Sequence, residues 1–134
     1  PVALRQDPRN LTALDIFKTF QFESSHRLPN VRPGHKCARM HGHSYRVTVT
    51  VSGEIGSVSG WVCDFADLAT AWVPLNQVLD HRTLNDVEGL ENPTSEHLAI
   101  WIWEHLIGTL PNLSEVKVSE TCSSGCIYRG PARP

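Results

Sequence analysis

Two histidines, His41 and His43, open a segment that alternates apolar and polar residues as a half-buried β-strand does. Strand side chains repeat every two residues, so both imidazoles share the apolar face of that strand. Its apolar positions are Tyr45, Val47, Val49 and Val51. A divalent metal would offset the desolvation cost of both rings, because neutral imidazole is a preferred zinc ligand. The alternative is two histidines at the surface, or hydrogen-bonded to a loop.

A third histidine is placed to join this pair. The segment 16–23 alternates as a second strand, and His26 falls on the face of Phe20 and Phe22 if that strand stays extended. Three histidine ligands with one open position are the pattern of a catalytic zinc site, and the lack of oxygen ligands favours zinc over Mg²⁺ or Ca²⁺. His-x-His also occurs in metal hydrolases built on (β/α)₈ barrels. Those barrels need about 250 residues, whereas this chain has 134.

Cys37 lies in the loop before His41, and its thiol admits three interpretations. It is a fourth zinc ligand that closes the site, an inert small hydrophobe, or a nucleophile or base activated by a nearby cation. Lys36 and Arg39 flank it, which suits the third interpretation. Spacing alone leaves the three about even.

Asp80 and His81 form a second candidate pair. A carboxylate beside an imidazole can fix the tautomer of the ring and raise its basicity, as a general base needs. Adjacent side chains need not touch, however. The alternative is an acidic residue at a helix end beside a surface histidine.

Glu120 shares the parity of Val116 and Val118, which puts a carboxylate on the apolar side of a predicted strand. Burying it is costly unless it is paired, and no basic residue is adjacent in the sequence. A ligand with two parallel N–H groups, such as the amino-pyrimidinone edge of a pterin or guanine, would pair with it bidentately. The alternatives are an internal salt bridge, or a strand that ends at Ser119.

Composition excludes several classes of protein. The length fits one domain, and 12 Lys and Arg against 14 Asp and Glu give no basic footprint for nucleic acid or a membrane surface. No apolar run approaches the roughly 20 residues of a membrane span, and no signal-like segment opens the chain. The unevenly spaced cysteines indicate a reducing, cytoplasmic setting. Of these, we expect the pair Cys122 and Cys126 to flank a turn, not to form a second metal site.

The expected elements form an α+β domain over residues 15–134, preceded by an N-terminal extension at 1–14. They are strands at 16–23, 41–52, 61–63, 116–118 and 127–128, with helices at 64–79 and 93–107 and a loop at 81–92. Pro74 should kink or interrupt the first helix. Leaving out the short strand at 61–63, the order ββααββ predicts an antiparallel sheet with both helices on one face.

The second helix is apolar all round from Leu98 to Trp103. Such a helix must be covered on more than one side, and a small domain has little material to do so alone. We therefore expect oligomerisation, in preference to a helix buried deeply within a monomer.

Six segments together resemble the 6-pyruvoyl-tetrahydropterin synthase family, in order and over most of the chain. They are Phe22–Leu28, Cys37–His43, Leu79–His81, Leu84–Asn85, Pro93–Glu96 and Glu120–Thr121. Within the family, three segments resemble the bacterial 6-carboxytetrahydropterin synthases of queuosine biosynthesis: Gly34–Cys37, Gly89–Ser95 and Glu120–Gly130. Cys37 also distinguishes the chain from family members that carry Glu at this position and act in folate synthesis.

The resemblance implies the tunnelling fold, a four-stranded antiparallel sheet with two helices per subunit. Three subunits would close a barrel, and two trimers would stack as a homohexamer with active sites between subunits. The implied reaction converts 7,8-dihydroneopterin triphosphate into 6-carboxy-5,6,7,8-tetrahydropterin, acetaldehyde and triphosphate. It needs one Zn²⁺ per subunit and no nicotinamide.

The resemblance also implies roles for individual residues. His26, His41 and His43 would bind zinc, and Cys37 would be catalytic with Asp80 and His81 as its proton partners. Glu120, with Thr121, would anchor the pterin, while Lys36 and Arg39 are candidates for the triphosphate. Two rival functions remain: a 6-pyruvoyl-tetrahydropterin synthase that keeps the two-carbon fragment, and a non-catalytic zinc-binding module with Cys37 on the metal.

Overall fold

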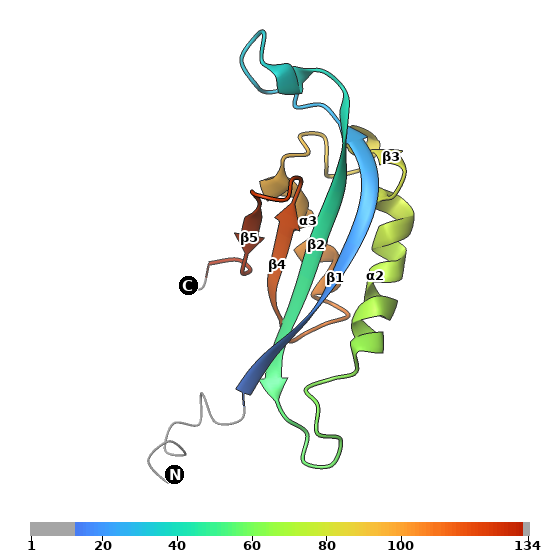
Figure 1. Ribbon diagram of the computed structural model, residues 1–134, viewed down its shortest axis with the longest axis vertical. Coiled ribbons are helices and arrows are strands. Elements are labelled where there is room, and N and C mark those ends of the chain that lie inside the picture. The colour runs from blue at the N-terminus through green and yellow to red at the C-terminus, as the bar shows by residue number, and fades with distance from the viewer. Residues whose placement is uncertain (1–12, 133–134) are drawn as a thin grey trace.

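Two helices pack against one face of a five-stranded sheet in the computed structural model, which describes residues 13–132 (Figure 1). The strands are β1 (Ala13–His26), β2 (His41–Glu54), β3 (Arg82–Thr83), β4 (Leu113–Ser119) and β5 (Cys126–Tyr128), and the helices are α2 (Phe65–Leu79) and α3 (Ser95–Leu106). Two single-turn 3-10 helices, η1 (Lys36–Ala38) and η2 (Leu84–Asp86), lie in the loops. The sheet order is β3-β1-β2-β4-β5.

The predicted α+β architecture is confirmed, with one addition to the sheet. Four strands are antiparallel neighbours as expected, but β3 pairs in parallel with Ser24 and Ser25 of β1. This strand lies where we expected a loop, because two residues are too few to show an alternating pattern. β1 begins at Ala13, two residues before the expected domain start, and residues 1–12 of the predicted extension lie outside the described residues.

The expected strand at 61–63 is wrong. These residues form bends, and the carbonyl of Trp61 accepts a hydrogen bond from the backbone N–H of Gly56, 2.9 Å away, within the same loop. Backbone groups that are satisfied locally are not available for a sheet ladder.

The core fills the space between the sheet and the helices. Phe22 of β1 and Tyr45 of β2 are register partners, and their rings stack with centroids 4.9 Å apart. Asp64 caps α2 by accepting a hydrogen bond from the N–H of Ala66 at 2.9 Å. The helix continues through Pro74, so the expected interruption at this residue was wrong. Pro74 is exposed, and buried leucines before and after it hold both halves of the helix against the sheet.

α3 is covered within the single chain. Trp101 is 7% exposed and Trp103 is 8% exposed. The ring of Trp103 packs edge-on against Tyr128 of β5, and Trp101 lies against Gly89. The tryptophans of α3 are therefore covered within one subunit, so this helix does not by itself require a second subunit, and oligomerisation stays a prediction.

In the part of the chain that the structure describes, no helix lies on the other face of the sheet, as Figure 1 shows for β1, β2 and β4. Its side chains include Thr19 and Thr48, whose hydroxyl groups are 3.0 Å apart across the two strands. No helix among residues 13–132 is long and apolar enough to cross a membrane.

Candidate functional site

Three histidines converge where β1 ends and β2 begins. His26 is the register partner of His41, and Ser24 is that of His43. One ring nitrogen of each of the three histidines lies within 4.8 Å of the others. The antiparallel pairing of β1 with β2 thus brings together the three residues that the sequence had placed on separate strands. Among the described residues, this is the one group of His, Cys, Asp and Glu side chains that is close enough to hold a metal ion.

Backbone carbonyls determine the tautomers of two of these rings. Nδ1 of His26 lies 2.8 Å from the carbonyl oxygen of Pro93, and Nδ1 of His41 lies 2.7 Å from that of Arg39. A carbonyl only accepts, so each Nδ1 carries the proton and donates it. The Nε2 lone pairs of the two rings then face each other at 3.1 Å. Metal-binding histidines commonly have such a second hydrogen bond, which orients the ring and fixes its tautomer.

Burial keeps this cluster receptive to a cation. His26 is 1% exposed, and its pKa is lowered chiefly by burial, although the Pro93 carbonyl acts in the opposite direction. The Nε2 atom of His43 is also buried and has no hydrogen-bond partner. Facing lone pairs and an orphaned buried nitrogen are unfavourable without a positive centre between them. The donor set therefore fits a divalent metal ion of the kind that prefers imidazole.

Glu120 follows the end of β4 and points to the same cluster. Its carboxylate lies 3.7 Å from Nε2 of His43 and 4.0 Å from Nε2 of His26, with the side chain 24% exposed. Within the described residues no lysine or arginine pairs with it, so the internal salt bridge that we weighed as an alternative is not formed with either cation. The sequence had singled out Glu120 and the histidines separately and did not show that they meet.

Tyr45 is a site residue that sequence reasoning assigned to the core. Its ring centroid lies 5.9 Å from that of His26 and 5.5 Å from that of His43, and its hydroxyl group is buried without a partner. Burial raises the pKa of this phenol, with the nearby Glu120 carboxylate acting in the same direction. Its parity with His41 and His43 in the sequence was the signal that should have placed it at the cluster.

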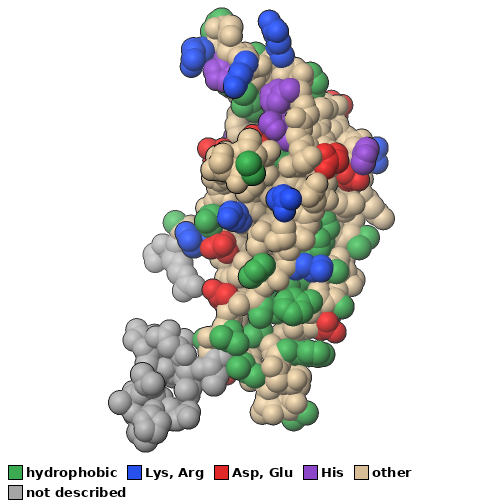
Figure 2. All heavy atoms as spheres, viewed as in Figure 1, with side chains coloured by type: hydrophobic (Ala, Val, Ile, Leu, Met, Phe, Trp, Pro, Cys, Tyr) green, Lys and Arg blue, Asp and Glu red, His purple; other side chains and the backbone are tan. Residues whose placement is uncertain are grey.

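Cys37 lies in η1, in the loop that joins β1 to β2, and is not a member of the histidine cluster. Its N–H donates to Nδ1 of His35 at 3.0 Å, and its carbonyl accepts from the N–H of Leu28 at 2.8 Å, so the loop folds back on itself. This loop is rich in basic residues and contains no Asp or Glu. Residues 27–40 include Arg27, Arg32, His35, Lys36 and Arg39. Figure 2 shows Lys and Arg side chains gathered at the same end of the molecule.

Asp80 and His81 are in contact, at the turn between α2 and β3. One oxygen of the Asp80 carboxylate is 2.8 Å from Nδ1 of His81, and the other accepts from the N–H of Glu23 at 2.9 Å. The pKa of Asp80 is lowered first by the Glu23 N–H and then by His81. His81 has φ of 57°, and among the described residues it is the one non-glycine residue with positive φ. Its N–H is held by the Glu23 carbonyl at 2.6 Å.

The Asp80–His81 pair lies beside β1, and His81 lines a shallow pocket together with His43 of the histidine cluster. Within the described residues, the hydrogen bonds of Asp80 and His81 go to Glu23, to the carbonyl of Asn76 and to each other, and none links the pair to Cys37 or to the cluster histidines. His81 is 78% exposed. In a single chain, the side chains of Asp80 and His81 are therefore accessible from outside.

Thr121 belongs to the turn between β4 and β5. Its hydroxyl group lies 2.7 Å from that of Ser124 and accepts from the N–H of Ser123 at 3.4 Å. Cys122 and Cys126 flank this turn, as expected, and both are free thiols. The turn begins directly after Glu120, so the hydrogen bonds within the turn stabilise the backbone next to Glu120.

The sequence and the structure both have close counterparts among known proteins. The profile of the 6-pyruvoyl tetrahydropterin synthase family matches residues 15–131. A 6-carboxy-5,6,7,8-tetrahydropterin synthase from Synechocystis is 44% identical over 122 residues, which cover 87% of this chain and 93% of that protein. The human 6-pyruvoyl tetrahydrobiopterin synthase is 36% identical over 131 residues, covering 86% and 90%. The solved structure of 6-pyruvoyl tetrahydropterin synthase from Caenorhabditis elegans superposes with a TM-score of 0.82 at 29% identity, covering 89% of this chain and 96% of that one.

Proposed function

This chain belongs to the 6-pyruvoyl tetrahydropterin synthase family, and within it we propose that the protein is a 6-carboxy-5,6,7,8-tetrahydropterin synthase. The reaction converts 7,8-dihydroneopterin triphosphate and water into 6-carboxy-5,6,7,8-tetrahydropterin, acetaldehyde and triphosphate, as a step towards queuosine. The observation that carries the proposal is the cluster of three imidazole nitrogens with Cys37 outside it. A site that protein ligands leave open suits catalysis, whereas a structural zinc site is closed by four of them.

His26, His41 and His43 would hold the metal, which we propose to be Zn²⁺, one per subunit. Zinc in this position supplies a Lewis acid that acidifies hydroxyl groups of the substrate side chain. The Pro93 and Arg39 carbonyls keep His26 and His41 in the tautomer that points Nε2 into the site.

Glu120 would anchor the pterin ring. Its carboxylate has no Lys or Arg partner among residues 13–132, so the two parallel N–H groups of an amino-pyrimidinone edge can bind it in the bidentate manner of a guanidinium. The hydrogen bonds of Thr121 within the following turn would hold the backbone of Glu120 in place. Because Glu120 also lies close to the histidines, it would fix the pterin with its side chain directed at the metal site.

Cys37 would move the proton on the substrate side chain, with Asp80 and His81 as its proton partners. Asp80 accepts from Nδ1 of His81, which leaves Nε2 of that ring free to take up or release a proton. The pair faces outward from its own chain, so it would serve Cys37 of another copy. This arrangement supports a homo-oligomer with shared sites, and we propose the hexamer of two stacked trimers.

Two further features follow from this assignment. Lys36 and Arg39 would bind the triphosphate, because they flank Cys37 in a loop without carboxylates. Four free thiols support a reducing, cytoplasmic setting for the enzyme.

Product analysis tests the function. Purified protein loaded with zinc is incubated with 7,8-dihydroneopterin triphosphate, and acetaldehyde is followed by the oxidation of NADH with alcohol dehydrogenase. We expect acetaldehyde and a 6-carboxypterin mass in equal amounts, and neither with Cys37→Ala. A pyruvoyl product without acetaldehyde would instead identify a 6-pyruvoyl-tetrahydropterin synthase. No turnover, with Cys37 found on the metal by X-ray absorption, would identify a structural zinc module.

A further inference from the structure

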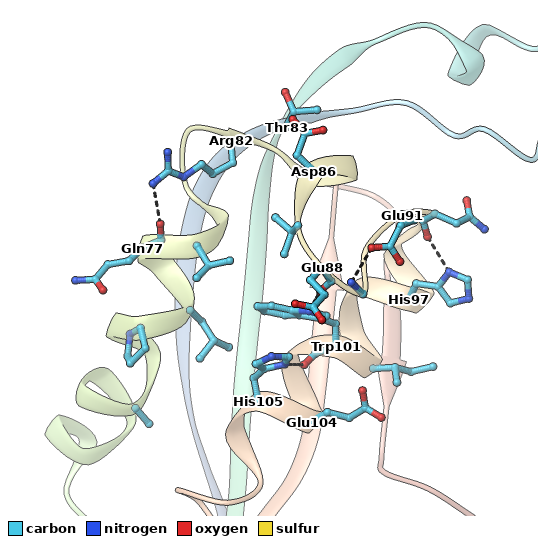
Figure 3. A pocket seen from close by; sticks show the side chains of 18 of the residues that line it. Gln77, Arg82, Thr83, Asp86, Glu88, Glu91, His97, Trp101, Glu104 and His105 are labelled. Atoms are coloured by element: carbon cyan, nitrogen blue, oxygen red, sulfur yellow. Dashed lines mark hydrogen bonds between the residues drawn. The ribbon is translucent and has the colours of Figure 1, made fainter.

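A groove runs between α2 and α3 on the helical side of the molecule, with a volume of about 1250 Å³ (Figure 3). It contains none of the three cluster histidines and neither Cys37 nor Glu120. The groove is therefore a feature separate from the proposed reaction site.

The floor of the groove is formed by aromatic and aliphatic side chains. Trp101 lies at its base, where the indole N–H donates to the carbonyl of Glu88 at 3.0 Å and the ring packs against Gly89. The His105 ring stacks on the indole with centroids 3.8 Å apart. Val78 of α2, which is 42% exposed, and the partly buried Ile100 of α3 extend the apolar surface along both walls.

The rim of the groove is acidic. Four exposed carboxylates border it: Asp86, Glu88, Glu91 and Glu104. Figure 3 shows Glu88 directed over Trp101. Among the described residues no cation forms an ion pair with any of the four. Arg82, the one Lys or Arg in the lining, donates its guanidinium to the carbonyl of Gln77 at 3.3 Å on the outer side of α2.

This charge decides which ligands the groove can take. A triphosphate, a nucleic acid or an anionic lipid surface would be repelled by four uncompensated carboxylates. An apolar floor with an acidic border matches a segment that is apolar on one side and cationic on its flanks. Binding of an amphipathic helix with its apolar face in an apolar groove is also a recurring mode of peptide recognition.

We propose that the α2–α3 groove binds a basic amphipathic helix of a partner protein. The apolar face of that helix would lie on Trp101, Ile100 and Val78, and its Lys or Arg side chains would reach Glu88 and Glu104. α2 is 15 residues long and spans roughly 22 Å at 1.5 Å per residue. A partner helix of about 12 to 15 residues would fill the groove from end to end.

A synthetic peptide tests the proposal on the intact protein. The probe is a fluorescein-labelled 14-residue peptide of Leu and Lys, with Leu at helical spacing, titrated in 150 mM NaCl and followed by fluorescence anisotropy. We expect saturable binding in the micromolar range. A peptide of the same composition with Leu and Lys scrambled, and one with Glu in place of Lys, should bind at least about tenfold more weakly.

Single charge reversals locate the binding site. Glu88→Lys and Glu104→Lys change exposed rim residues, and each should weaken binding of the Leu–Lys peptide by roughly fivefold or more. Glu54→Lys is the matched control, because Glu54 is exposed at the end of β2 and does not line the groove. Its peptide affinity should stay within about twofold of the unmodified protein.

Four outcomes would overturn the proposal. They are the absence of saturable binding, equal binding of the scrambled or Glu peptide, and unchanged affinity in both rim variants. The fourth is self-association in sedimentation that Glu88→Lys and Glu104→Lys abolish, which would show that a second copy of this chain occupies the groove.

Discussion

Substitutions at His81 test whether its left-handed backbone conformation lowers the stability of the folded protein. Its φ of 57° lies in the left-handed region, and adopting this backbone conformation costs a non-glycine residue roughly 1–2 kcal/mol of conformational energy. Glycine adopts this conformation without that cost but loses about 0.5–1 kcal/mol more backbone entropy on folding than alanine does. Both His81→Gly and His81→Ala remove the imidazole and its contact with Asp80, so the difference between these two variants isolates the backbone.

The two terms predict that His81→Gly is more stable than His81→Ala by roughly 0.5–1 kcal/mol, the reverse of the order found within helices. Urea denaturation followed by circular dichroism, at matched protein concentration, measures the difference. For a domain of this size it corresponds to a change of roughly 2–4 °C in Tm. Turnover should fall at least ~10²-fold in both variants, because neither carries the proposed proton-transfer group. Equal stability, or a more stable alanine variant, would refute the strained backbone.

Four other perturbations address the metal and the substrate. Chelation should lower the Tm, and Zn²⁺ should restore it, because the facing Nε2 atoms of His26 and His41 lose their shared cation; a Tm that chelator leaves unchanged would contradict this. Lowering the pH from 7 to 5 should destabilise the metal-free protein, because burial lowers the pKa of His26 in the folded chain below the 6.5 at which the unfolded chain takes up the proton. A Tm that rises over that interval would show the opposite sign. Cys37→Ala should keep one zinc per subunit by metal analysis and lose at least ~10²-fold in turnover, whereas loss of zinc would make Cys37 a ligand. Glu120→Gln should weaken pterin binding in calorimetry with zinc retained; an unchanged affinity for the pterin would remove Glu120 from the anchoring role.

Local patterns in the sequence were sufficient for the long strands β1 and β2 and for the faces they present, but not for β3 or for residues 61–63. His41 and His43 share a face with Tyr45 because strand side chains alternate, and this relation does not depend on the rest of the fold. The same argument placed His26 with Phe22, whereas for Glu120 the alternative is confirmed, because β4 ends at Ser119. Helix caps such as Asp64 are equally local, since the side chain bonds to an N–H two residues later.

The sequence was misleading where packing decides the outcome. α3 is apolar on all sides, which suggested a second subunit, yet its tryptophans are covered by Tyr128 and Gly89 of the same chain. Pro74 predicted a kink or an interruption, but α2 is continuous through this residue, with buried leucines on both sides of it. In both cases contacts from distant segments outweigh the local signal.

Residue types identify which side chains have the chemistry for this site, whereas the way those side chains are arranged depends on the folded chain. Residue type alone makes His26, His41, His43, Cys37 and Glu120 candidates. The tautomer of His26 depends on the carbonyl of Pro93, 67 positions away, and the conformation of His81 depends on Glu23, on a different strand. Such contacts are set by strand register and helix packing, which close long loops and leave no trace in the spacing of neighbouring residues.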